Sequence, residues 1–194
     1  GMYLSSHPLD QYRFEMDTFA TNQITEIDGL VTECQDTKTK KKVSVAGFVI
    51  SNQIMTGKTG KPWAKTVIED FSGSYELAFF GKDHEAYMNY MAVNNALFIE
   101  GEIDEKYYIK PEDRAKGKTS DYAFKVKKIM LLGNVSDTYL KGFSINITTT
   151  MLSPEFRKKL LEMLKDNKGN TPLTMYLYDP EKGWNIEFFS RKFK

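Results

Sequence analysis

The stretch VSVAGFVI, Val43–Ile50, decides the fold, because it opens a series of predicted β-strands that fills the middle of the chain. Most of its residues are β-branched or aromatic, which favours a strand. Its one glycine, Gly47, is typical of a bulge or of a sharp bend at a barrel corner. We therefore expect the first strand of a barrel here.

Four more strands and one helix are predicted downstream. Residues 63–69 alternate between apolar and polar positions and join residues 75–80 across a tight turn, which indicates a hairpin. Residues 83–91 have a helical pattern, and residues 97–103 and 122–126 alternate again. Three meandering strands, a helix and two strands are the order of a five-stranded OB-type Greek-key barrel. A generic β-meander with a helix is the alternative, but five strands in about ninety residues favour the barrel.

Two further segments flank this barrel, which we assign to residues 43–135. Residues 1–42 lack a clear period and end in a lysine run, so we interpret them as a linker with short helical or extended segments. Residues 140–194 contain a strand, a helix that starts at Ser153-Pro154 and two further strands, which together make a small α+β domain. The fold class is mainly β with an α+β extension, and the last domain is small for a core of its own.

Some aromatic residues have an expected place in the packing. Phe80, directly before the predicted helix, is expected in the barrel core. Trp184 and the pair Phe188–Phe189 are expected in the core of the last domain or at an interface that lacks its partner. For Trp63 the pattern leaves two interpretations open, a residue that stacks on a ligand and a plug at the end of the barrel.

The composition excludes several classes of protein. The 194 residues include 27 Lys and Arg and 26 Asp and Glu, so any anion-binding surface must come from local clustering. Cys34 is the only cysteine, and His7 and His84 lie far apart, so we expect no disulfide, no metal site and no cofactor. No stretch has the length of a membrane span and no signal peptide opens the chain, so we expect a cytoplasmic protein without a membrane partner.

The sequence shows no pattern of a catalytic site. No Ser/His/Asp or Cys/His arrangement stands out. Gly57-Lys58-Thr59 resembles the end of a phosphate-binding loop, but Asn52 stands where that pattern needs its first glycine, and a strand follows in place of a helix. We therefore expect a binding protein and not an enzyme.

Basic and aromatic residues gather in the two loops that flank the ligand face of an OB barrel. Seven lysines and no acidic residue occur from Lys38 to Lys65, and the loop between the fourth and fifth strands holds further cations and two tyrosines. Lysines can follow phosphates while exposed rings stack on bases, which contributes about 1–3 kcal/mol per base. The candidate nucleic-acid-binding residues are Lys58, Lys61, Trp63, Lys65, Lys106, Tyr107, Tyr108, Lys110, Arg114, Lys125 and Lys127.

The same residues have a plainer interpretation. Lysine-rich loops often only keep a protein soluble, and the second loop also carries acidic residues, Asp104, Glu105, Glu112 and Asp113. The residues alone leave nucleic-acid binding and simple solubility equally open. Lys65 and Lys127 are the better candidates, because a charged side chain inside a strand must face outward.

Several motifs resemble the alpha subunit of bacterial DNA polymerase III, a replicative C-family polymerase. Met2–Asp10, MYLSSHPLD, is similar to that family's His-Pro linker before its OB domain. Val43–Val49 resembles the first strand of that domain, Thr66–Glu76 its hairpin and Phe98–Ile103 its fourth strand. Weaker similarity continues through residues 160–173, so the resemblance covers nearly the whole chain.

The resemblance implies a C-terminal fragment of that polymerase, with the OB domain and part of a truncated tau-binding domain. The family's catalytic carboxylates lie on a palm domain that this sequence does not contain, so the parent is a transferase and the fragment is expected to have no activity of its own. The implied function is single-stranded DNA binding in DNA replication. The implied partners are the single-stranded template, the remainder of the polymerase and the clamp-loader tau subunit.

Two alternatives remain at this point. The chain is either a protein-interaction module that docks the tau subunit, with the barrel as a scaffold, or an anticodon-binding OB domain of a tRNA synthetase. The His-Pro linker and the last domain argue against the second of these.

Overall fold

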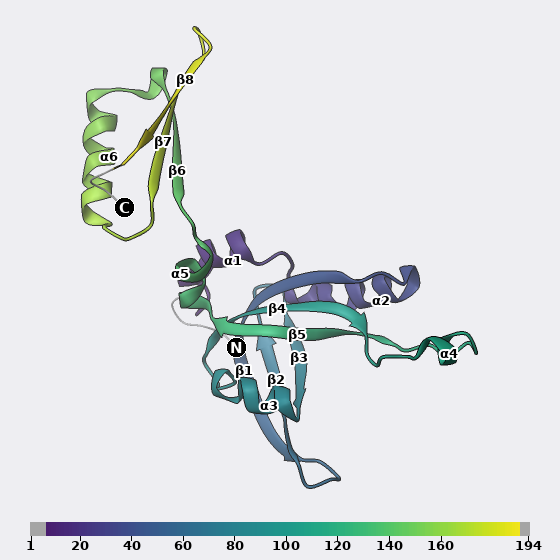
Figure 1. The fold of residues 1–194 in the computed structure, drawn as a ribbon. Coiled ribbons are helices and arrows are strands. Elements are labelled where there is room, and N and C mark those ends of the chain that lie inside the picture. The colour runs from purple at the N-terminus through teal and green to yellow at the C-terminus, as the bar shows by residue number, and fades with distance from the viewer. Residues whose placement is uncertain (1–6, 191–194) are drawn as a thin grey trace. The chain divides into compact units, whose positions relative to one another are not determined.

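The computed structural model describes residues 7–190 (Figure 1). The first five residues of the His-Pro motif and the last four residues of the chain lie outside this range. The chain forms two compact units, residues 1–136 and residues 137–194. No helix within residues 7–190 has the length and apolarity that a membrane crossing requires.

The first unit contains one antiparallel sheet of five strands in the order β3-β2-β1-β4-β5. The strands are β1 (Lys41–Thr56), β2 (Pro62–Glu69), β3 (Ser74–Phe80), β4 (Ala96–Glu105) and β5 (Tyr122–Leu131). The first half of β1 pairs with β4 and its second half pairs with β2, so this long strand belongs to both sides of the barrel. Helix α3 (Lys82–Tyr87) lies between β3 and β4 in the chain. The predicted OB-type barrel is confirmed, and β3 and β5 are its two edge strands, which do not pair with each other among the described residues.

The bend in β1 does not occur at Gly47, where the sequence suggested a bulge. The register with β2 shifts between Val49 and Ser51 instead. Gly47 has a different reason to be a glycine, because a Cβ atom there would lie 2.6 Å from the side chain of Ile24 and 3.2 Å from the carbonyl oxygen of Glu69. The missing side chain lets the segment before the barrel approach β1 closely.

The barrel core combines alternate strand residues with the segment that precedes them. The described part of that segment holds η1 (Asp10–Tyr12), α1 (Arg13–Phe19), η2 (Ile24–Glu26) and α2 (Ile27–Thr37). Ile24, Ile27 and Cys34 are buried in the same cluster as the strand residues, and α2 contacts β4 and β5 (Figure 1). The segment interpreted as a linker therefore packs as part of the barrel unit.

A buried carboxylate fixes this segment to the turn between β2 and β3. Asp70 accepts hydrogen bonds from the backbone N–H of Ile24, at 2.9 Å, and from that of Ser72, at 2.7 Å. It also accepts from the N–H of Gly73 at 3.2 Å. One side chain thus satisfies the start of η2 and closes the hairpin turn.

The second unit has a three-stranded sheet in the order β6-β7-β8. Its elements are β6 (Phe143–Thr148), α6 (Pro154–Asp166), β7 (Leu173–Asp179) and β8 (Trp184–Phe189), with β6 and β7 parallel and β7 and β8 antiparallel. The shorter helices of the chain are η3 (Met88–Tyr90), α4 (Pro111–Arg114), η4 (Leu132–Asn134), α5 (Val135–Tyr139) and η5 (Thr149–Met151). As predicted, Ser153 caps α6, and its hydroxyl accepts from the N–H of Phe156 at 3.1 Å.

The core of the second unit is small. Among its described residues only Ile147, Leu173 and Asp179 are buried. The expectation that Trp184 and Phe188–Phe189 fill this core was wrong, because they are 36%, 45% and 72% exposed. All of β8 is exposed, so these rings lie on an edge strand that no element within residues 7–190 covers. The other expectation for them, an interface without its partner, stays a prediction.

Candidate nucleic-acid interface

Two arms project from the barrel, as Figure 1 shows. The first is the hairpin of β1 and β2, whose strands stay paired out to Thr56 and Pro62. Lys58 and Lys61 are exposed in its tip, where Gly60 adopts a positive φ of 75° that closes the turn. Within residues 7–190 neither lysine has an ion-pair partner, so both charges are available to an anion.

An aromatic pair lies at the base of this arm. Trp63 of β2 stands opposite Phe80 of β3, with ring centroids 4.8 Å apart and planes inclined by 18°. The strand alternation buries Leu77 and Phe79 and leaves Phe80 59% exposed. The expectation that Phe80 belongs to the core was therefore wrong, because its position in β3 belongs to the outer face. Trp63 shares the partly exposed positions of β2 with Lys65, so it lies beside Phe80 on that face and does not plug the barrel.

A groove of about 680 Å³ lies between the edge strands β3 and β5, which do not pair with each other. Phe80, Tyr87, Lys106, Phe124 and Lys125 are among the residues that line it. The hydroxyl of Tyr87 donates a hydrogen bond of 2.8 Å to the backbone carbonyl of Lys127 in β5. Burial raises the pKa of this hydroxyl, and the charge of Asp83 acts in the same direction. Tyr87 therefore stays protonated and joins α3 to β5 across the groove.

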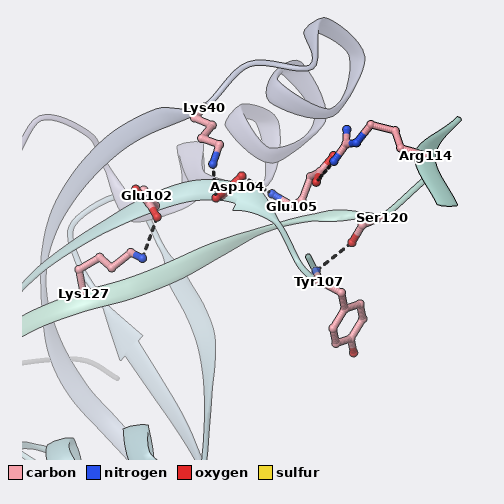
Figure 2. A network of polar contacts seen from close by, with 8 residues as sticks. All are labelled: Lys40, Glu102, Asp104, Glu105, Tyr107, Arg114, Ser120 and Lys127. Atoms are coloured by element: carbon pink, nitrogen blue, oxygen red, sulfur yellow. Dashed lines mark hydrogen bonds and ion pairs between the residues drawn. The ribbon is translucent and has the colours of Figure 1, made fainter. Parts of the chain in front are cut away.

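Several of the predicted cationic side chains already form ion pairs with acidic residues of the protein. Lys65 contacts Glu76 at 2.6 Å. Figure 2 shows two further pairs, in which Arg114 contacts Glu105 at 2.5 Å and Lys127 contacts Glu102 at 2.7 Å. The other predicted cations form no ion pair with a described residue; they are Lys58, Lys61, Lys106, Lys110 and Lys125. The structure thus divides the predicted cations into a paired set and an unpaired set.

The acidic residues of the second arm, between β4 and β5, take part in this pairing. A hydrogen bond from Arg114 lowers the pKa of Glu105, and one from Lys40, at 2.8 Å, lowers the pKa of Asp104. The contact with Asp104 raises the pKa of Lys40 in turn. These carboxylates stay ionised at neutral pH and hold the base of the arm together.

Two tyrosines stand out from the second arm. Tyr107 and Tyr108 are 67% and 82% exposed. The N–H of Tyr107 donates to the hydroxyl of Ser120 at 2.9 Å, and Figure 2 shows the Tyr107 ring directed away from the Arg114–Glu105 pair. The ammonium group of Lys106 lies 5.8 Å from the centroid of the same ring. Both rings are therefore exposed to a stacking partner, and Tyr107 has a cation beside it.

The described part of the barrel unit thus presents two kinds of exposed group, cationic and aromatic. Unpaired lysines occur on both arms, and exposed rings occur at the base of the first arm and on the second. Phe80 and Tyr87 were not among the predicted site residues, although the alternation of β3 carried the signal for Phe80. Residues 7–190 contain no group of three or more His, Cys, Asp or Glu side chains that could hold a metal ion.

The strand order and the two arms define an OB-type barrel followed by a small α+β unit. Residues 143–194 match the family model described as "DNA polymerase III alpha subunit, C-terminal domain". The DNA polymerase III alpha subunit of Vibrio cholerae is 21% identical over 93% of the chain, and that of Pseudomonas fluorescens is 24% identical over 97%. The predicted resemblance to DNA polymerase III alpha subunits is confirmed, and the chain spans 14% of the length of these two relatives.

One solved structure of similar type is a mitochondrial single-stranded DNA-binding protein from S. cerevisiae. It is 17% identical to this chain, and the alignment covers 48% of this chain and 97% of that protein, with a TM-score of 0.32. The barrel assignment rests on the strand order of the chain itself.

Proposed function

We propose that the chain is a single-stranded DNA-binding module of a bacterial replicative polymerase, and that it performs no chemistry itself. One observation carries the proposal: Lys58 and Lys61, both exposed and without an ion-pair partner among the described residues, lie in the turn that leads directly into Trp63, whose ring stacks on Phe80 on the outer face of the barrel. The resemblance to DNA polymerase III alpha subunits supports DNA as the ligand. The bound DNA would be the single-stranded template of the parent polymerase. We propose the cytoplasm as the place where this polymerase acts.

The chemistry of the site suits a single strand better than a duplex. A single strand offers both its phosphates and the faces of its bases, whereas a duplex hides those faces in its stack. The lysines can neutralise phosphates and release their counterions, while the exposed rings accept bases of any sequence. Few unpaired cations are present, so the affinity of the isolated chain should be modest. Tethering beside the other DNA contacts of a polymerase would raise the effective concentration.

Charge reversal tests the proposed surface. We expect Lys58→Glu/Lys61→Glu to abolish binding of an oligo-dT probe at low salt, measured by fluorescence anisotropy, with an unchanged circular dichroism spectrum. The matched control is Lys158→Glu/Lys159→Glu, which changes the net charge equally at two exposed positions of α6. An equal loss in both variants, or no binding by the unmodified protein even at low salt, would reject the proposal.

A second candidate function is docking of the clamp-loader tau subunit. Trp184, Ile186 and Phe188 alternate along β8 and are all exposed, so this outer strand presents a row of apolar side chains. Capture of purified tau in the absence of DNA, lost in Ile186→Ser/Phe188→Ser, would favour this function. A third candidate, an anticodon-binding domain, would require that structured RNA binds more tightly than single-stranded DNA.

A further inference from the structure

The two faces of the Phe80 ring have different surroundings. Trp63 covers one face at a centroid distance of 4.8 Å, and Trp63 is not among the residues that line the groove between β3 and β5. Phe80 does line that groove and remains 59% exposed. An exposed phenylalanine whose ring is already oriented by a stacked neighbour is a preorganised partner for one more flat ring.

We propose that this groove is a slot for a single nucleobase, which stacks on the free face of Phe80. This inference deepens the proposed function and rests on it. It assigns the base-binding role to the gap between β3 and β5, whereas the sequence pattern placed the candidates on β2, β5 and the two arms. The ligand class is a nucleobase of single-stranded DNA with its flanking phosphates.

The groove exists because the barrel is left open at this place. β3 and β5 form no ladder with each other, and the bond from Tyr87 to the carbonyl of Lys127 joins the two sides instead. The resulting space of about 680 Å³ falls within the range of small-molecule sites, about 300–1,000 Å³. A base is flat and apolar on its faces, which suits walls that include the rings of Phe124 and Tyr87.

The charges along the groove suit the backbone on either side of that base. Lys106 and Lys125 line it, and neither forms an ion pair with a described residue. Glu76 also lines it, but its carboxylate is neutralised by Lys65 at 2.6 Å. Asp83 is the remaining acidic residue of the lining. The two free ammonium groups therefore outnumber the one free carboxylate, which favours a site for phosphates.

A purely structural role for Phe80 makes a different prediction. Cross-strand aromatic pairs stabilise hairpins whether or not a ligand is present. In that case Phe80→Leu would lower the melting temperature but would not change the ratio of the affinities for a strand with bases and for a strand without them. The decisive measurement is therefore the preference for bases, and not the total affinity.

An abasic probe separates the two roles. The unmodified protein should bind oligo-dT about tenfold more tightly than an abasic deoxyribose-phosphate oligomer of equal length, because only the first probe can stack. Phe80→Leu should reduce this preference to what Tyr107 and Tyr108 contribute and keep its affinity for the abasic oligomer, whereas Phe80→Tyr should retain the full preference. The matched control is Phe71→Leu, which changes an exposed phenylalanine in the turn at the other end of the same hairpin.

Each outcome decides between the proposals. A preference of undiminished size in Phe80→Leu, or one reduced equally in Phe71→Leu, overturns the base slot while leaving single-stranded DNA binding intact. Equal binding of both probes by the unmodified protein also overturns it. Absence of binding to either probe at low salt rejects the proposed function and the slot together. A folded Phe80→Leu variant whose preference is reduced, with an unchanged affinity for the abasic oligomer, supports the slot.

Discussion

The division of cations into paired and unpaired sets predicts the salt dependence of DNA binding. Of the eight predicted cations, three are held in ion pairs, which leaves five. If each of the five neutralises one phosphate, the slope of log K against log salt for a single strand is about −3.5, from about −0.7 per phosphate. Removing Lys58 and Lys61 by the double change to alanine should reduce the slope to about −2.1.

These slopes give distinct losses of affinity over an ordinary salt range. Between about 50 mM and about 200 mM salt, the unmodified protein should lose roughly 100-fold in affinity and the double variant roughly 20-fold. Anisotropy titrations with an oligo-dT probe at four salt concentrations measure both slopes. The control is Lys65→Gln/Glu76→Gln, which removes an existing ion pair at constant net charge and should leave the slope unchanged.

Two results would refute this reasoning. If the alanine variant keeps the slope of the unmodified protein, the arm of β1 and β2 does not contact phosphates. If the control variant loses as much slope as the alanine variant, ion pairing within the protein does not decide which lysines meet the DNA.

Three further predictions concern single residues. Gly47→Ala should destabilise the barrel by about 1–3 kcal/mol in urea unfolding, because the added methyl group has no space, whereas Gly29→Ala in α2, with nothing within 4 Å, should be neutral or stabilising. Asp70→Ala should cost about 1–3 kcal/mol in the same assay, because it leaves buried N–H groups without an acceptor. An NMR titration should find the pKa of the Glu105 carboxyl below its ordinary value of 4.5, and Arg114→Gln should return this pKa towards that value. Because the folded pKa is lowered, the stabilisation of the fold by this carboxylate is present above pH 4.5 and is lost as the pH falls through the lowered pKa.

Much of the barrel could be predicted because its strands alternate. Positions 64, 66 and 68 of β2 are buried as their pattern predicts, and the helix between β3 and β4 lies where the sequence placed it. The alternation of β3 also indicates an outward position for Phe80, but its large apolar side chain favoured the core instead. The groove that it lines could not be predicted from one strand, since it depends on which strands fail to pair.

The ion pairs were beyond reach of the sequence for a related reason. Lys65 lies opposite Ala78, and its partner Glu76 lies opposite Val67, so the contact is diagonal across two strands. Such a contact requires the register of β2 against β3. Likewise, the sequence of residues 7–40 shows no strand or strong helical period. Their packing on the barrel depends on the absent side chain of Gly47 and on the carboxylate of Asp70, which is 46 residues away from its donor, the N–H of Ile24.

The hydroxyl of Tyr87 has a consequence for the mechanics of the barrel. A ladder between two strands distributes load over many backbone bonds, whereas here β3 and β5 share no ladder and the phenol of Tyr87 in α3, the helix that follows β3, bonds to β5. The opening between β3 and β5 is therefore where the barrel should first undergo sub-global opening, which needs far less free energy than complete unfolding. Amides along β3 and β5 would exchange their hydrogens sooner than those of β2 and β4, each of which is paired with a strand on both sides. Tyr87→Phe, which removes only the hydroxyl, would widen that difference.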